Sequence, residues 1–148
     1  MISKSETAVN YFNSGYNCCQ SVVLAFSDDV GLDKATAARL ANAFGGGLSW
    51  TDNICGTAFG IALLISLKNG KEVPEQTDRQ TKTYTLTNQA MAEFKAAFHG
   101  KNKCTELLGY NLSLPEEKEK AIEQDTFHKV CNDYVAKAAE IAEKYLAM

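Results

Sequence analysis

Apolar residues recur at three- and four-residue spacing through most of the chain, and glycines or capping residues separate the runs. Ser3 followed by Glu6, and Asn17 followed by Gln20, have the spacing of capping boxes and predict two helix starts. The pattern predicts helices over residues 4–14, 18–30, 34–44, 55–69, 75–99 and 103–108, a further start at Pro115, and a last helix over 127–145. We therefore expect an all-α, single-domain bundle of roughly six to eight helices across residues 1–148.

Two segments are less regular. Residues 81–87 alternate with a period of two and are rich in threonine, which also suits a strand. No second strand is available to pair with this segment, and an isolated strand is not stable, so a helix is favoured. Residues 48–53 follow three consecutive glycines and are expected to form a polar connector.

Charge and composition exclude some classes of function. The chain has 148 residues, a net charge of −3 and no basic cluster, so it does not resemble a nucleic-acid-binding protein. Its longest aliphatic run, residues 61–65, is too short to span a membrane, and residues 1–6 lack the apolar run of a signal peptide. We expect a cytoplasmic protein whose cysteines are reduced or bound to metal.

Three of the five cysteines lie where helices are predicted to begin. Cys18, Cys55 and Cys104 each follow an asparagine by one or two residues, and asparagine is a good helix cap. The free N–H groups at a helix start stabilise a thiolate, so lowered pKa values are expected for these thiols. Cys131 lies on an apolar stripe, which also suits a buried structural cysteine. Cys19 points about 100° away from Cys18 on the same helix, so only one of the two faces a common site.

Two glycines near the start of the fourth predicted helix add to this picture. Gly56 and Gly60 are four residues apart and share one helix face. A face without side chains lets another backbone approach closely, or leaves room for a cofactor. Gly56 and Gly60 therefore indicate either close helix packing, which is favoured, or a cofactor-binding position.

The order of these elements resembles a known family. The segments are Gly15-Tyr-Asn-Cys18-Cys-Gln-Ser-Val22, Phe44-Gly-Gly-Gly47, Cys55-Gly-Thr-Ala-Phe-Gly60, Cys104-Thr-Glu-Leu-Leu-Gly109 and finally Cys131. Together they resemble the C_GCAxxG_C_C family of redox-active proteins, with Thr57 as a departure within the central element. The resemblance implies that Cys18, Cys55, Cys104 and Cys131 are the signature cysteines and that Gly60 is the closing glycine. A similar domain occurs in split-Soret cytochrome c, but without Cys-x-x-Cys-His no covalent haem is expected here.

Three hypotheses about function remain open. In the first, the four signature cysteines gather in one pocket and perform thiol/disulfide or electron-transfer chemistry with an unidentified redox partner, which would make the protein an oxidoreductase. In the second, the same four cysteines bind a metal ion or an iron–sulfur cluster. In the third, the chain is a non-enzymatic helical binding or assembly protein, and a homo-oligomer is compatible with all three.

Overall fold

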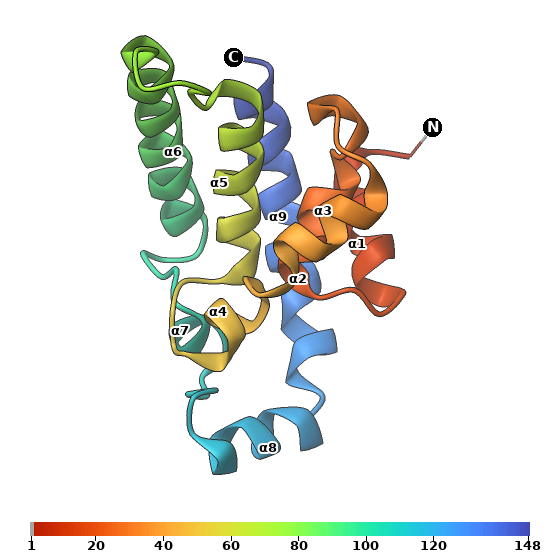
Figure 1. The fold of residues 1–148 in the computed structure, drawn as a ribbon. Coiled ribbons are helices and arrows are strands. Elements are labelled where there is room, and N and C mark those ends of the chain that lie inside the picture. The colour runs from red at the N-terminus through yellow and green to blue at the C-terminus, as the bar shows by residue number, and fades with distance from the viewer. Residues whose placement is uncertain (1) are drawn as a thin grey trace.

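Helix α9 (Thr126–Leu146) is the axis of the bundle and contacts α1, α2, α5 and α6 (Figure 1). The computed structural model describes residues 2–148, and in this range it contains eight α-helices and no strand. This confirms the all-α prediction. The other elements are α1 (Lys4–Asn13), α2 (Cys18–Ala25), the 3₁₀-helix η1 (Asp28–Val30), α3 (Lys34–Asn42), α5 (Gly56–Asn69), α6 (Thr77–Ala97), α7 (Cys104–Leu108), α8 (Pro115–Glu123) and the short segment α4 (Gly45–Trp50).

The predicted helix starts at Ser3, Asn17 and Asp33 are confirmed. Each side chain accepts a hydrogen bond from the backbone N–H three residues later, which satisfies a donor that the helix itself leaves free. Residues 81–87 lie within α6, where Thr83 and Leu86 are buried against the bundle. The helix prediction for this segment is therefore confirmed.

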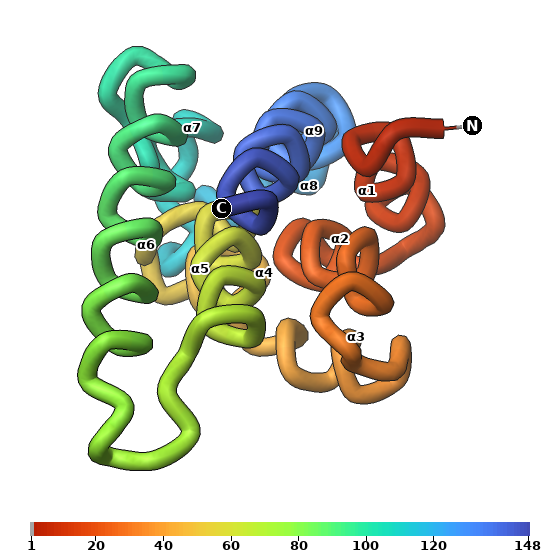
Figure 2. Tube along the Cα trace, turned by 90° about the horizontal axis from the view of Figure 1, so that it is seen from above, coloured from red at the N-terminus to blue at the C-terminus, as the bar shows by residue number. Residues whose placement is uncertain are grey.

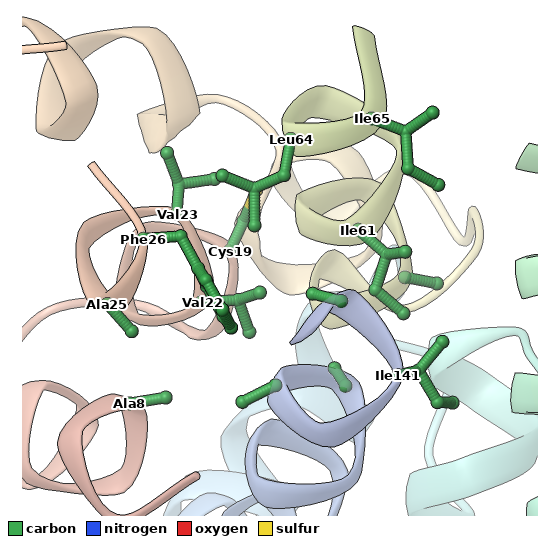
Figure 3. Close-up of a cluster of buried hydrophobic side chains, with 14 of the residues drawn as sticks. Ala8, Cys19, Val22, Val23, Ala25, Phe26, Ile61, Leu64, Ile65 and Ile141 are labelled. Atoms are coloured by element: carbon green, nitrogen blue, oxygen red, sulfur yellow. The ribbon is translucent and has the colours of Figure 1, made fainter. Parts of the chain in front are cut away.

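The main core lies between α2, α5 and α9, which surround it as seen along the bundle in Figure 2. Val22 and Val23 from α2 meet Ile61, Leu64 and Ile65 from α5, and all five are fully buried (Figure 3). Alanines on α9 let that helix approach both partners closely. Burial of these aliphatic side chains is the main stabilising contribution to the bundle.

A second, smaller apolar cluster lies at the lower end of the bundle in Figure 1, where α7 and α8 are drawn. It joins α7, α8 and α9 through five residues, namely Cys104, Leu108, Leu112, Ala121 and Cys131. Phe12 and Tyr134 pack against both clusters. The boundary between the clusters is where the candidate site lies.

A short backbone bridge joins the segments before α5 and α7. The N–H of Cys55 donates to Asn102 O at 2.7 Å, and the N–H of Cys104 donates to Asn53 O at 3.1 Å. The prediction that the side chains of Asn53 and Asn102 cap these helices is wrong, because Cys55 and Lys103 occupy the cap positions. The two asparagines instead contribute backbone carbonyls, and this pairing places Cys55 beside Cys104.

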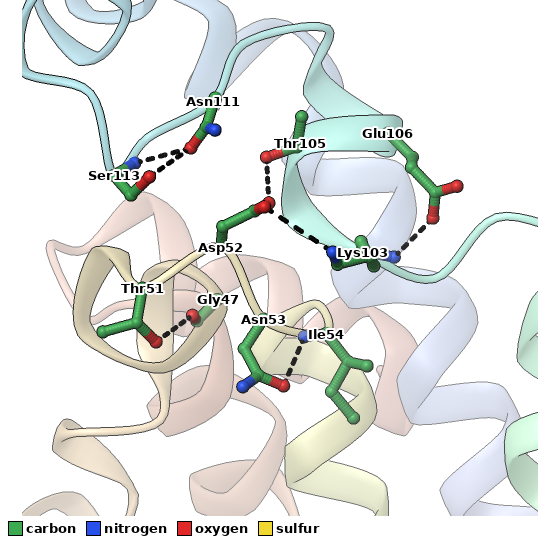
Figure 4. Close-up of polar contacts among 10 residues, drawn as sticks. All are labelled: Gly47, Thr51, Asp52, Asn53, Ile54, Lys103, Thr105, Glu106, Asn111 and Ser113. Carbon is green, nitrogen blue, oxygen red and sulfur yellow. Dashed lines mark hydrogen bonds and ion pairs between the residues drawn. The ribbon is translucent and has the colours of Figure 1, made fainter.

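Segment α4 winds in the opposite sense to the other helices. Gly46, Gly47, Leu48 and Ser49 have φ between 56° and 69°, and φ of Trp50 is 65°, so five successive residues are left-handed. The expected polar connector is therefore a left-handed turn. It is held by hydrogen bonds from Ser49 Oγ to Ala43 O and from the Asn53 N–H to Gly47 O, and by Thr51 Oγ1, which donates to Gly47 O (Figure 4).

Candidate functional site

All four signature cysteines line one cavity of about 170 Å³ at the boundary between the two apolar clusters. Cys18 is the first residue of α2, Cys55 caps α5, Cys104 is the first residue of α7, and Cys131 lies in the second turn of α9. Four separate helices thus bring together sulfurs that are far apart in the sequence. All five cysteines of the chain are free thiols in the structure.

The Cys18 thiol is surrounded by backbone N–H donors. The backbone N–H groups of Gly46, Cys19 and Gly56 favour its thiolate form and lower its pKa. They come from the left-handed turn and from the starts of α2 and α5. Burial has the larger effect, so the pKa of Cys18 lies above its ordinary value.

The Cys55 thiol lies over the start of α5. Its Sγ is 3.1 Å from Thr57 Oγ1. The backbone N–H groups of Thr57 and Ala58 also act to lower its pKa. Burial, followed by the nearby Cys18, raises the pKa of Cys55 to about 12 in spite of these donors. Cys55 is therefore a neutral thiol at neutral pH.

Cys104 and Cys131 lack such donors among the described residues. Burial and the neighbouring cysteines raise the pKa of both thiols. The expectation of lowered pKa values at the helix starts is therefore wrong, because removal from water outweighs the local N–H groups in this apolar cavity. Cys18 and Cys55 still differ from the other two because nearby backbone N–H groups partly offset the effect of burial on their pKa values.

Cys19 points away from the cavity. Its side chain is fully buried in the main core, beside Val22 and Val23 (Figure 3). Burial raises its pKa well above the ordinary value. Of the adjacent pair, Cys18 faces the cavity and Cys19 belongs to the core.

Gly56 and Gly60 lie where α5 approaches α2. A Cβ atom on Gly56 would be 2.5 Å from Cys18 Sγ and 2.8 Å from Phe44 O. A Cβ atom on Gly60 would be 3.0 Å from the Cβ of Val22. Both glycines thus allow close packing in this structure, and Gly56 also leaves room for the Cys18 sulfur.

Aromatic side chains form much of the cavity wall, and sequence reasoning did not assign them to the site. The rings of Trp50 and Phe127 are 5.9 Å apart, and Phe12 and Tyr134 also line the cavity. Trp50 is brought there by the left-handed turn. Residues 45–47, three consecutive glycines before Trp50, are the sequence feature that permits a left-handed turn. Three glycines alone do not predict such a turn.

The four cysteines suit a soft metal or a cluster by their chemistry, because thiolates are the usual ligands of zinc and iron–sulfur centres. Within residues 2–148, however, no three cysteine, histidine or acidic side chains stand close enough to hold a metal ion. For metal binding, the cysteine side chains would have to change conformation so that their sulfurs come closer together, and the thiols would have to lose their protons. His128 pairs with Asp125 at 2.7 Å and does not line the cavity.

The cap of α2 offers a test of how the site is held. Asn17→Ala removes a cap that also lines the cavity, whereas Asp33→Ala removes the cap of α3, which does not. We expect each variant to lose about 1 kcal/mol of stability in chemical denaturation. Only Asn17→Ala should speed iodoacetamide labelling of Cys18, because it frees the first turn of α2. Equal labelling in the two variants would show that Asn17 does not hold the thiol in place.

The fold and site define a helical protein built around a four-cysteine cavity. A family model described as "Putative redox-active protein (C_GCAxxG_C_C)" matches residues 16–145, and the chain belongs to this family. No curated protein and no solved structure matches the chain. In the part of the chain that the structure describes, no helix is long and apolar enough to cross a membrane.

Proposed function

We propose that the four-cysteine cavity is the redox centre and that Cys18 and Cys55 form its dithiol/disulfide couple. The observation that carries the proposal is that the Cys18 sulfur lies against Gly56, the residue that follows Cys55, only 2.5 Å from the position that a Cβ atom would take there. The two cysteines thus lie at neighbouring helix starts and line the same cavity. Cys104 and Cys131 also line the cavity wall. Their thiols are neutral at neutral pH because burial raises the pKa of both.

The proposed reaction is a two-electron thiol–disulfide exchange, in which the substrate disulfide is reduced and the cysteine pair is oxidised. The Cys18 thiolate attacks one substrate sulfur, forms a mixed disulfide and releases the first product thiol. Cys55 then attacks Cys18 Sγ, which closes the Cys18–Cys55 disulfide and releases the second product thiol. The two cysteine protons leave with the products, and an external dithiol returns the pair to the reduced state. We propose the cytoplasm as the location, because a reducing compartment supplies such a dithiol.

Cys18 is assigned the attacking role because of its surroundings. The N–H groups directed at Cys18 stabilise its thiolate against the cost of burial. Cys18 is also partly exposed, whereas Cys55, Cys104 and Cys131 are buried. Cys55 is held by Thr57 beside it and suits the resolving role.

Mass spectrometry of the oxidised protein tests the proposal. After anaerobic reduction and addition of a small disulfide, we expect a Cys18–Cys55 link and the loss of two hydrogens. Cys55→Ser should accumulate a mixed disulfide on Cys18, and Cys18→Ser should accumulate none. Cys19→Ser is the matched control, because Cys19 lies in the core, and it should still form the link. A link between Cys104 and Cys131, or a mixed disulfide in Cys18→Ser, would contradict the assignment.

A second candidate is an iron–sulfur or zinc centre held by the same four cysteines. The observation in its favour is that one cavity collects four sulfurs and is otherwise lined mainly by apolar side chains. Absorption spectroscopy and elemental analysis of anaerobically purified protein separate the two candidates. Charge-transfer bands with stoichiometric iron, or stoichiometric zinc, would support the metal centre and contradict the thiol couple.

A further inference from the structure

The cavity contains no side chain that would pair with a charged ligand. Within the described residues, its lining includes no Asp, Glu, Lys, Arg or His. Apart from the cysteines and the uncharged indole N–H of Trp50, its polar side chains are Asn17, Thr57 and Tyr134. The walls are otherwise mainly leucine and aromatic side chains.

The three polar side chains already have partners in the protein. Asn17 Oδ1 accepts from the Gln20 N–H at 2.9 Å, and its amide group donates to Asn42 O at 2.9 Å. Tyr134 donates to Leu107 O at 2.8 Å, and Thr57 Oγ1 lies 3.1 Å from the Cys55 sulfur. A charged group that entered the cavity would lose its water and gain no counter-charge, which is strongly unfavourable.

Charged side chains lie next to the cavity wall but not in its lining. The Lys118 ammonium is 5.6 Å from the centre of the Trp50 ring, and Asp52 forms an ion pair with Lys103 (Figure 4). Lys118 would favour an anion near Trp50. The test therefore needs substrates of both signs.

The volume limits what can enter. An engineered protein cavity of about 150 Å³ with apolar walls binds benzene. The cavity here, at about 170 Å³, thus has room for one short arm of a disulfide together with the sulfur under attack. A bulky peptide disulfide does not fit within it.

Resting on the proposed function, we propose that the substrate is a small disulfide with short, uncharged arms. The Cys18 thiolate attacks the substrate sulfur inside the cavity, the substrate S–S bond breaks, and the departing thiolate takes a proton at the cavity mouth. Closure of the Cys18–Cys55 disulfide then releases the second arm as a thiol. The substrate disulfide is reduced by two electrons and the cysteine pair is oxidised.

Three disulfides of similar size test the charge selectivity. They are bis(2-hydroxyethyl) disulfide, which is neutral, cystamine, which carries two ammonium groups, and 3,3′-dithiodipropionate, which carries two carboxylates. The rate of Cys18 oxidation is measured with the intact 148-residue chain. Each rate is divided by the rate for the same reagent with urea-unfolded protein, which removes differences in leaving-group reactivity.

We expect the normalised rate for the neutral disulfide to exceed both charged ones by about ten-fold or more, because only the charged arms lose water without compensation. Equal rates, or a faster rate for the dicarboxylate, would overturn the inference about the substrate. If the Cys18–Cys55 link forms with all three reagents, the proposed function stands and only the selectivity fails. If the link forms with none, the proposed function fails.

A pair of matched variants places the selectivity in the cavity. Phe127→Glu adds a carboxylate to the cavity lining, and Tyr84→Glu adds the same charge on exposed α6. We expect Phe127→Glu to raise the rate for cystamine relative to the dicarboxylate, and Tyr84→Glu to leave that ratio unchanged. Circular dichroism shows whether each variant is folded. The same ratio in both folded variants would contradict a charge-excluding cavity.

Discussion

Replacing Gly56 by alanine is expected to destabilise the protein by about 3 kcal/mol and to abolish formation of the Cys18–Cys55 disulfide. The added Cβ would be 2.5 Å from Cys18 Sγ and 2.8 Å from Phe44 O, and a backbone oxygen cannot move aside as a flexible side chain can. Denaturant unfolding measures the first effect. Mass spectrometry after oxidation measures the second.

Gly60→Ala is the matched control because it adds the same methyl group to the same helix. Its Cβ would be 3.0 Å from the Cβ of Val22, so some stability should be lost without displacement of the Cys18 sulfur. The Cys18–Cys55 link should still form in this variant. A normal yield of the link in Gly56→Ala would show that the space beside Gly56 is not required for the couple.

The second large effect concerns pH. Burial raises the pKa of Cys55 to about 12 and also raises the pKa values of Cys19, Cys104 and Cys131. An unfolded thiol loses its proton near pH 8.5, whereas these folded thiols keep theirs. The stabilising effect is therefore complete below about pH 8.5 and is lost as the pH rises towards the folded pKa values.

For Cys55 alone, the loss at pH 10 is about 2 kcal/mol. With three further buried thiols shifted in the same direction, the reduced, metal-free protein should lose most of its stability between pH 8 and 10, since small domains have only about 5–15 kcal/mol in total. Denaturant unfolding under anaerobic reducing conditions across this range measures the effect. Cys55→Ser removes one titrating thiol, so the slope should decrease by about 1.4 kcal/mol per pH unit. Stability that is constant from pH 8 to 10 would contradict burial of neutral thiols.

The helices could be predicted from the sequence because their signals are local. Ser3, Asn17 and Asp33 cap the first three helices through contacts three residues away, and the stripe on α9 repeats along a single helix. The caps at Asn53 and Asn102 were predicted wrongly because a long-range backbone bridge uses these residues instead. A pairing between residues that are about fifty positions apart leaves no local pattern to detect.

The sequence identified the cysteines of the site more reliably than their pKa values or the other residues of the cavity wall. The position of Cys18 at a helix start was correct, and the N–H donors it implies are present. Their effect on the pKa is reversed by burial, which depends on how distant helices pack. Trp50 and Phe127 were not assigned to the site, because they meet only after the left-handed turn and α9 are in place.

The left-handed turn makes part of the site depend on the stability of its surroundings. Leu48, Ser49 and Trp50 adopt a conformation that costs L-residues about 1–2 kcal/mol each, so the segment does not keep this shape by its own preference. Contacts from Ala43, Asn53 and Phe127 hold it. When these contacts open, the segment can relax and withdraw the Gly46 N–H from Cys18 while the helices of the main core stay folded. We therefore expect local opening of this segment, before global unfolding, to disassemble the cavity.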